Sequence, residues 1–228
     1  MNKNLTEIAF ILDRSGSMAP VTESAITGFN EFLRDQQKTE GQARLTLVLF
    51  DDEYLVPLDA IPVQEAVALD TTTYVPRGST ALLDAIGETI NRLGTRLSAT
   101  PEPERPAQVI VAILTDGYEN ASEKFAWKDI SRMILEQTNT YKWHFLFLGA
   151  NQDAIATAAC LNIDAANAAN YTADNIGTHS TSKAMSRKMS AIRKMSLGGI
   201  MSCQEQVDLA APIRNLVAEE DAEGRKGT

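Results

Sequence analysis

Four short, mostly apolar runs at residues 5–12, 43–50, 109–115 and 143–149 limit the folds that are open to this chain. Runs of this kind are typical of strands that are covered on both faces of a sheet. Segments with a helical pattern lie between them. This alternation predicts an α/β fold, with a doubly wound, mostly parallel sheet and helices on both faces.

The remaining segments give the expected order of elements and the domain boundaries. Helices are predicted at residues 80–97, 129–137, 152–161 and 181–196. Residues 54–58 follow the turn Asp51-Asp52 and are expected to return antiparallel at the edge of the sheet, while 165–170 form a poor edge strand. We assign residues 1–196 to one domain and residues 197–228 to a C-terminal extension that is partly flexible.

Composition excludes several classes of protein. The chain has 228 residues, 44% of them hydrophobic and 22% charged, which is typical of a globular domain. Its net charge of -9 disfavours nucleic-acid binding, because phosphates are recognised through positive charge. No stretch approaches the roughly 20 apolar residues that span a bilayer, so we expect no membrane insertion. Cys160 and Cys203 form no metal-ligand or redox pattern, and we expect a cytoplasmic location.

Oxygen donors occur where the predicted sheet would bring them together. A carboxylate and two hydroxyls follow the first strand in the segment Asp13-Arg14-Ser15-Gly16-Ser17. Thr80 precedes a predicted helix, and Asp116 ends the run 109–115. Ligands of doubly wound sheets bind at the carboxyl ends of strands. Hard oxygen donors at this edge favour Mg²⁺, Ca²⁺ or Mn²⁺ over zinc.

This set resembles the metal-ion-dependent adhesion site of the von Willebrand factor type A (VWA) family, with its D-x-S-x-S segment, distant Thr and distant T-D-G. The five matching positions are Asp13, Ser15, Ser17, Thr80 and Asp116. The resemblance covers roughly residues 5–195 and includes the run from Gly78 to Gly87. It implies a VWA fold, which is Rossmann-like, with an intact metal site.

The resemblance also implies how the site would work. In the family the serines and the threonine contact the metal directly or nearly so, and the aspartates often act through water. Neutral hydroxyl ligands leave the ion short of negative charge, so one position stays open to a carboxylate from another protein. The implied function is a protein-protein interaction module that binds Mg²⁺, with Mn²⁺ or Ca²⁺ as alternatives, and an Asp or Glu of an unidentified partner protein. Small cytosolic bacterial members often serve as adaptors to ATPases or in stress-response, phage or mobile-element systems.

Each of these residues also has an ordinary interpretation as a turn or cap residue, and Thr80 alone would suit a helix N-cap. As a matched set they favour the metal site. Four neighbours are candidate rim residues: Arg14, Arg77, Asp84 and Glu119. The two arginines either orient an acidic partner or are ordinary surface residues. For Asp84 a solvated carboxylate at a helix start is preferred, and Glu119 and Asn120 either line the rim or make a turn.

The sequence lacks common signs of catalysis, and we expect no enzyme activity. His144 lies in an apolar run and His179 in a Ser/Thr-rich stretch, while neither a G-x-S-x-G elbow around the serines nor a G-x-x-x-x-G-K-[ST] loop occurs. The alternative function is a metal-dependent phosphohydrolase that uses Asp13. Such phosphatases resemble D-x-D, however, and Ser15 occupies the second Asp position. A third class, a structural component of a particle, would not need the metal ligands.

Residues 183–194 carry five positive charges and no negative one. One interpretation is a helix that docks on an anionic membrane or an acidic partner. The other, which we prefer, is a final helix that packs Met185, Met189 and Ile192 against the sheet and exposes its Lys and Arg side chains to water.

Overall fold

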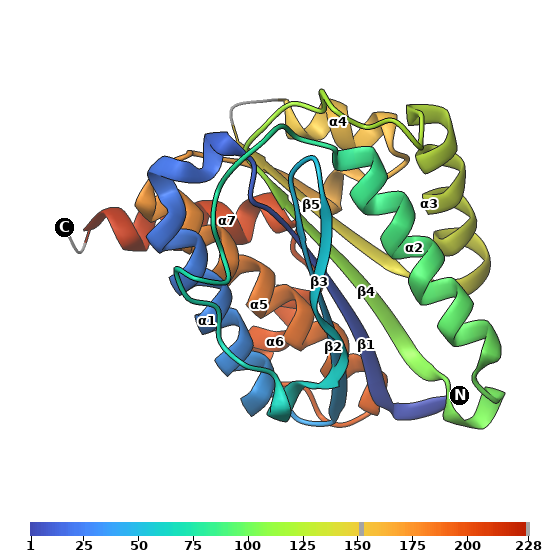
Figure 1. Ribbon diagram of the computed structural model, residues 1–228. Helices are drawn as coiled ribbons and strands as arrows, with labels where there is room; N and C mark the ends of the chain where they lie inside the picture. The colour runs from blue at the N-terminus through green and yellow to red at the C-terminus, as the bar shows by residue number, and fades with distance from the viewer. Residues whose placement is uncertain (151–152, 227–228) are drawn as a thin grey trace.

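The computed structural model describes residues 1–150 and 153–226. Its centre is a six-stranded sheet in the order β3-β2-β1-β4-β5-β6 (Figure 1). The strands are β1 (Asn2–Asp13), β2 (Gln42–Phe50), β3 (Tyr54–Pro62), β4 (Pro106–Thr115), β5 (His144–Ala150) and β6 (Ala168–Tyr171). All neighbouring strands are parallel except β2 and β3, which are antiparallel. The predicted fold class is therefore confirmed, including the antiparallel edge strand.

Helices cover both faces of the sheet (Figure 1). They are α1 (Thr22–Lys38), α2 (Leu82–Ala99), α3 (Trp127–Tyr141), α4 (Ala154–Cys160), α5 (Asn175–Leu197), α6 (Cys203–Ala210) and α7 (Ile213–Lys226). One core contains residues of α1, α5 and α7, and the other contains residues of α2, α3 and α4. Within residues 1–150 and 153–226, no helix combines the length and the apolar character needed to span a bilayer.

Side chains of β1 alternate between these two cores. Phe10 packs with Phe29 and Phe32 of α1, at ring-centroid distances of 5.5 and 4.8 Å. Its neighbours Ala9 and Ile11 face the α2 side. Successive side chains of a strand point to opposite faces, so one buried strand serves both layers. This explains why the run 5–12 lacks a simple polar alternation.

Several boundaries differ from the sequence prediction, and helix α3 extends beyond the predicted 129–137 at both ends. Helix α2 begins at Leu82 rather than residue 80, because Thr80 belongs to the preceding loop, where its N–H donates to Asn120 Oδ1. Helix α5 begins six residues before residue 181, and the Asp174 side chain caps it by accepting from Gly177 N–H. The segment 165–170 is a short 3₁₀ turn followed by β6. The helix predicted at 152–161 is α4, and Gln152 lies outside the described residues.

The C-terminal segment continues the fold as two helices. Helices α6 and α7 pack on α5, and α7 places Ile213, Leu216 and Val217 in the core that it shares with α1. The division at residue 196 and the partial flexibility of 197–228 stay predictions. Residues 227–228 lie outside the part of the chain that the structure describes.

The positive charges of α5 are used inside the protein. Arg187 forms ion pairs with Asp208 of α6 and with Glu219 and Glu220 of α7, at 2.6, 3.1 and 2.9 Å. Lys188 Nζ donates to the carbonyls of Leu209 and Ala211 at the end of α6. The prediction that the cations of this helix face water is therefore wrong for Arg187 and Lys188. These contacts also argue against a free basic surface for docking.

Arg193 of α5 is 1% exposed and holds the C-terminal end of α1. Its guanidinium donates to the carbonyls of Gln36, Thr39 and Gly41 at 2.8, 3.3 and 2.9 Å, and to Gln36 Oε1 at 3.0 Å. The carbonyl end of a helix carries partial negative charge, which suits a cation. Burial nevertheless lowers the pKa of Arg193 to about 10. This side chain, too, is internal rather than water-facing.

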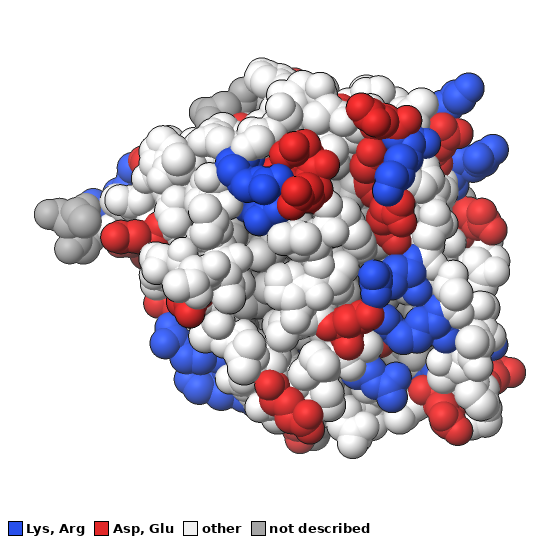
Figure 2. Space-filling model, in the orientation of Figure 1, with Lys and Arg blue, Asp and Glu red and all other residues white. Residues whose placement is uncertain are grey.

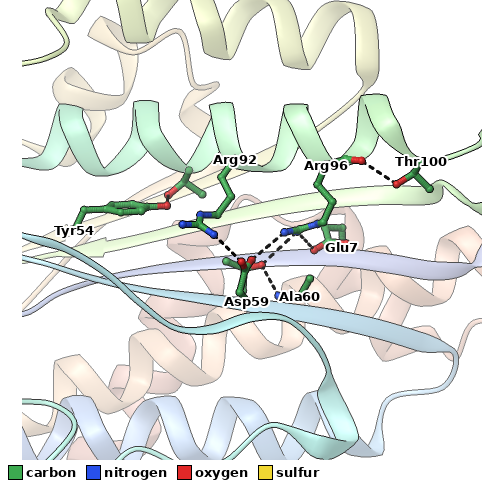
Figure 3. Close-up of polar contacts among 9 residues, drawn as sticks. Glu7, Tyr54, Asp59, Ala60, Arg92, Arg96 and Thr100 are labelled. Atoms are coloured by element: carbon green, nitrogen blue, oxygen red, sulfur yellow. Dashed lines mark hydrogen bonds and ion pairs between the residues drawn. The ribbon is translucent and has the colours of Figure 1, made fainter.

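Glu7 is a fully buried carboxylate in the middle of β1 (Figure 3). It pairs with Arg96 of α2 at 2.5 Å, and Arg96 also reaches Asp59 of β3 at 3.0 Å. Arg92, one turn earlier on α2, bonds to the same Asp59 at 2.6 Å. Burial raises the pKa of Glu7 to about 7, against the opposing effect of Arg96. The cluster ties the edge strand β3 to α2 across the sheet.

Replacing Arg193 with Leu removes the donors at the end of α1 and leaves their buried carbonyl partners without hydrogen bonds. We expect Arg193→Leu to lower the free energy of unfolding by about 3 kcal/mol, measured by urea denaturation. Lys183→Leu on the same helix is the control, because Lys183 is exposed and its loss should cost less than about 0.5 kcal/mol. Equal effects of the two substitutions would contradict the role given to Arg193.

Glu7→Gln keeps the shape of the side chain and an oxygen that accepts from Arg96. Since the pKa in the fold, about 7, lies above the ordinary value of 4.5, native wild-type protein holds this proton more tightly than the unfolded chain. That contribution to stability is complete below pH 4.5 and is lost as the pH rises through 7. We expect the variant to gain up to about 3 kcal/mol relative to wild type between these limits. Urea denaturation at several pH values measures the difference, and a pH-independent difference would refute the shift.

Candidate metal site

The predicted donors meet at the carboxyl edge of the sheet, at the top of Figure 1. Asp13 is the last residue of β1, and Asp116 directly follows β4. These two strands are parallel neighbours in register, with Leu12 opposite Leu114. Strand order reverses at this pair, since β2 and β3 lie beyond β1, and β5 and β6 lie beyond β4. A crevice at such a reversal is the usual ligand site of open α/β sheets.

The carboxylate of Asp13 is buried and held on both oxygens. Oδ1 accepts from Ser15 N–H at 2.7 Å, and Oδ2 accepts from Thr115 Oγ1 at 2.6 Å. Burial raises the pKa of Asp13 to about 6, while the hydrogen bonds from Thr115 and Ser15 act in the opposite direction. The first bond shapes the turn after β1, and the second joins the ends of β1 and β4.

A chain of hydrogen bonds connects the two serines to Asp116. Ser15 Oγ and Ser17 Oγ are 3.0 Å apart, and Ser17 Oγ donates to Asp116 Oδ1 at 2.6 Å. Burial raises the pKa of Asp116, and the bond from Ser17 opposes this shift. Ser15 is buried whereas Ser17 is exposed, so the chain runs from the interior to the surface.

Thr80 reaches the same point from the loop before α2. Asn120 fixes it on both sides, because Thr80 N–H donates to Asn120 Oδ1 at 2.9 Å and Asn120 N–H donates to the Thr80 carbonyl at 3.1 Å. A Cβ atom on Gly117 would lie 2.7 Å from Thr80 Oγ1, 3.4 Å from Ser17 Oγ and 3.6 Å from Ser15 Oγ. Three hydroxyls therefore lie close to Gly117, and a side chain at this position would displace the Thr80 hydroxyl.

The structure thus brings together all five residues predicted as metal ligands, and their binding of a metal stays a prediction. The donor set consists of three neighbouring hydroxyls and two carboxylates, of which Asp116 accepts from Ser17 Oγ and Asp13 accepts from Ser15 N–H, and it fits a hard divalent cation. Among the described residues, no three or more His, Cys, Asp or Glu side chains are grouped for metal binding. A hydroxyl-rich site contains only two such side chains, so that finding does not conflict with it.

The two candidate rim arginines are directed to an acidic turn after β2. Arg14 is buried and pairs with Asp51 at 3.1 Å and with Glu53 at 3.3 Å. Arg77 pairs with the same two residues at 2.9 and 2.8 Å. Figure 2 shows a group of acidic and basic side chains over this turn. The arginines therefore hold the turn next to the site, and their charge is already matched by carboxylates.

The two candidate rim carboxylates hold the loop 117–126 against the start of α2. Asp84 accepts from the N–H groups of Glu123, Lys124 and Phe125 at 2.9, 2.9 and 3.0 Å. Glu119 accepts from Leu83 N–H at 3.0 Å and from Ser122 N–H at 2.8 Å. Both satisfy backbone donors, which is the usual role of acidic residues at helix starts.

Sequence reasoning missed Thr115 and Tyr74, and it treated Asn120 only as part of the rim or a turn. Thr115 bonds to Asp13, as described above, and Tyr74 donates its hydroxyl to the Asp13 carbonyl at 2.6 Å. Burial raises the pKa of Tyr74 well above its ordinary value, so its hydroxyl stays a donor. Thr115 was visible as the first residue of T-D-G. Tyr74 lies in a polar loop with no pattern around it.

Neither histidine is part of the site. His144 at the start of β5 bonds to Gln108 Oε1 at 2.9 Å, and burial lowers its pKa. It lies at the amino end of its strand, away from the carboxyl ends where the site lies, and lines a hollow of about 580 Å³ between α3 and α4. His179 of α5 contacts Glu31 of α1.

No protein-family model matches the chain, and no curated protein matches it either. Solved structures do. Proximal thread matrix protein 1 from the mussel byssus shares 16% identity at a TM-score of 0.56, over 82% of this chain and 46% of that one. A von Willebrand factor type A protein from Catenulispora acidiphila shares 17% identity at a TM-score of 0.53, over 86% of this chain and 43% of that one. Manganese-loaded TRAP from Plasmodium vivax shares 15% identity at a TM-score of 0.51, over 75% of this chain and 70% of that one.

These similarities show that the chain has the VWA fold. The byssus protein has also been solved with a zinc-occupied metal-ion-dependent adhesion site, at 16% identity and a TM-score of 0.50. The chain spans less than half the length of the byssus and Catenulispora chains. At identities of 15–17% these similarities show the fold alone, so the function is argued from the residues of the site.

A methyl group at residue 117 tests whether the hydroxyls bind an ion. Gly117→Ala places a Cβ atom 2.7 Å from Thr80 Oγ1, while the φ angle of Gly117 is not in the left-handed region. We expect Mn²⁺ affinity to fall at least about tenfold, which is roughly 1.4 kcal/mol, in calorimetric titration of metal-stripped protein. Gly94→Ala on α2 is the control, because a Cβ there meets nothing within 4 Å. Unchanged affinity in Gly117→Ala would place metal binding elsewhere.

Proposed function

We propose that this protein is a metal-ion-dependent protein-protein interaction module. In this proposal the site binds Mg²⁺, or Mn²⁺ or Ca²⁺ in its place, and through the ion an Asp or Glu of a partner protein. The observation that carries it is the grouping of the Ser15, Ser17 and Thr80 hydroxyls within 3.6 Å of the Cβ position of residue 117. The zinc-occupied byssus protein and the manganese-loaded TRAP support a divalent cation in this fold.

The residues of the site would have different roles in metal binding. Ser15, Ser17 and Thr80 would supply neutral oxygen donors, and Asp13 and Asp116 would supply negative charge. A bound divalent cation supplies positive charge and a free coordination position. In this proposal the aspartates act through water and only neutral hydroxyls bind the ion directly, so the ion stays short of negative charge and attracts an external carboxylate. Thr115 and Ser15 N–H keep the Asp13 carboxylate in place while the partner binds.

We propose no catalytic role for Asp13. The phosphohydrolases considered above resemble D-x-D, and in this chain Ser15 stands at the position of the second aspartate. For location we propose the cytoplasm, since Cys160 and Cys203 are unpaired and exposed, as suits a reducing compartment. An adaptor role fits a module whose only proposed chemistry is recognition. With a net charge of -9, a nucleic-acid partner is disfavoured.

Thr80→Val removes one hydroxyl and keeps the shape of the side chain. We expect wild-type protein to bind Mg²⁺ and Mn²⁺ in calorimetric titration, and Thr80→Val and Asp13→Ala to lose at least about tenfold in affinity. Random peptides displayed on phage, captured in Mg²⁺ and released by chelator, should be enriched in Asp or Glu on wild type and not on Thr80→Val. Thr95→Val, at an exposed position of α2, is the matched control.

Three outcomes would contradict this function. Wild-type protein that binds neither ion would refute the metal site. Peptides captured equally with and without chelator, or without acidic residues, would refute recognition through the ion. Metal-dependent turnover of a phosphate ester that is lost in Asp13→Ala would favour the enzyme instead.

A further inference from the structure

Two buried tyrosines donate hydrogen bonds to the main chain directly below the candidate ligands. Tyr74 is 0% exposed, and its hydroxyl lies 2.6 Å from the carbonyl oxygen of Asp13. Tyr171, the last residue of β6, is 7% exposed, and its hydroxyl lies 3.3 Å from the carbonyl oxygen of Thr115. A buried hydroxyl without a partner is costly, so these bonds fix the rings and the carbonyls together.

The two accepting carbonyls belong to the residues at which the strands end. Asp13 ends β1 and carries a candidate ligand, and Thr115 ends β4 and precedes Asp116. The direction in which a side chain leaves the backbone follows from the position of the adjoining peptide units. A bond that holds the Asp13 carbonyl therefore also holds the Asp13 side chain and the turn to Ser15.

Tyr74 is itself held from the opposite side. It lies in the loop 66–81, which α1 fixes through Asn30: the Asn30 amide accepts from Leu69 N–H and donates to the Leu69 carbonyl, both at 2.8 Å. Tyr74 N–H donates to the Asp70 carbonyl at 2.9 Å. Further along, Arg77 N–H donates to the Arg14 carbonyl at 2.8 Å. The loop that delivers Thr80 is thus tied to the segment that delivers Asp13, Ser15 and Ser17.

We propose that Tyr74 is a positioning residue of the metal site. Its hydroxyl sets the main chain of Asp13 and so aligns the hydroxyls of the 13–17 turn with Thr80, without contacting the ion itself. Tyr171 does the same for the end of β4 through a longer bond. This inference rests on one part of the proposed function, the binding of a metal ion, because metal affinity is the quantity that its test measures.

Tyr74→Phe removes the hydroxyl alone and is the direct test. We expect Mg²⁺ affinity, measured by calorimetry on metal-stripped protein, to fall about fivefold, as for the loss of one buried hydrogen bond, with a smaller fall for Tyr171→Phe. Tyr54→Phe is the matched control. The hydroxyl of Tyr54 bonds to Thr89 Oγ1 at 3.2 Å between β3 and α2, so it should leave metal affinity unchanged.

Metal selectivity separates positioning from a general loss of stability. Mg²⁺ requires nearly ideal octahedral geometry, whereas Ca²⁺ accepts irregular coordination. A misaligned site should lose Mg²⁺ affinity about fivefold but Ca²⁺ affinity less than about twofold. Thermal unfolding without metal, compared between Tyr74→Phe and Tyr54→Phe, measures the structural cost separately.

The outcomes distinguish this inference from the proposed function. Unchanged Mg²⁺ affinity in Tyr74→Phe, or equal losses for Mg²⁺ and Ca²⁺, would overturn the positioning role and leave the interaction module standing. Wild-type protein that binds either ion but no acidic peptide would refute the partner chemistry and not the role of Tyr74. Wild-type protein that binds neither ion would refute both.

Discussion

The candidate site depends on the pairing of β1 with β4 in one register. Leu12 lies opposite Leu114, so the next residue on each strand, Asp13 and Thr115, can share a 2.6 Å hydrogen bond. A slip of one residue would turn every side chain of the strand to the other face. Two packed cores prevent that slip, because β1 contributes large side chains to both. The geometry of the site is thus a consequence of apolar packing along the whole strand.

Of the other donors, Ser17 lies in a short 3₁₀ helix (Gly16–Val21), and Ser15, Thr80 and Asp116 lie in loops. Side-chain to main-chain bonds set the positions of these loops. Asn30 holds the loop before Thr80, Asn120 holds Thr80 itself, and Glu119 and Asp84 hold the loop after Gly117. Each bond satisfies a backbone group that would otherwise need water. Residues that looked like candidate rim contacts in the sequence therefore serve the shape of the site, which lies among them.

The fold class and the five candidate ligands were predictable from the sequence, because both follow from patterns within short segments. Strands buried on both faces are apolar along their length, so the sequence alone predicts strands at 5–12 and 109–115. The same pattern places Asp13 and Asp116 at the ends of these strands. The role of α5 was not predictable, because Arg187 finds its carboxylates 21 and more residues away in a weakly patterned segment. Tyr74 was missed for the same reason, since its partner is 61 residues distant.

Two of the buried charged groups lie away from the candidate metal site. Arg193 holds the far end of α1, and Glu7 lies mid-strand under α2, whereas Asp13 is at the carboxyl edge. Removing one partner of a buried polar pair is costly, so the first two positions affect folding. At the site, the exposed Ser17 hydroxyl ends a chain of hydrogen bonds that begins at the buried Ser15. Substitution of Ser17 should therefore affect the proposed metal binding more than the stability of the fold.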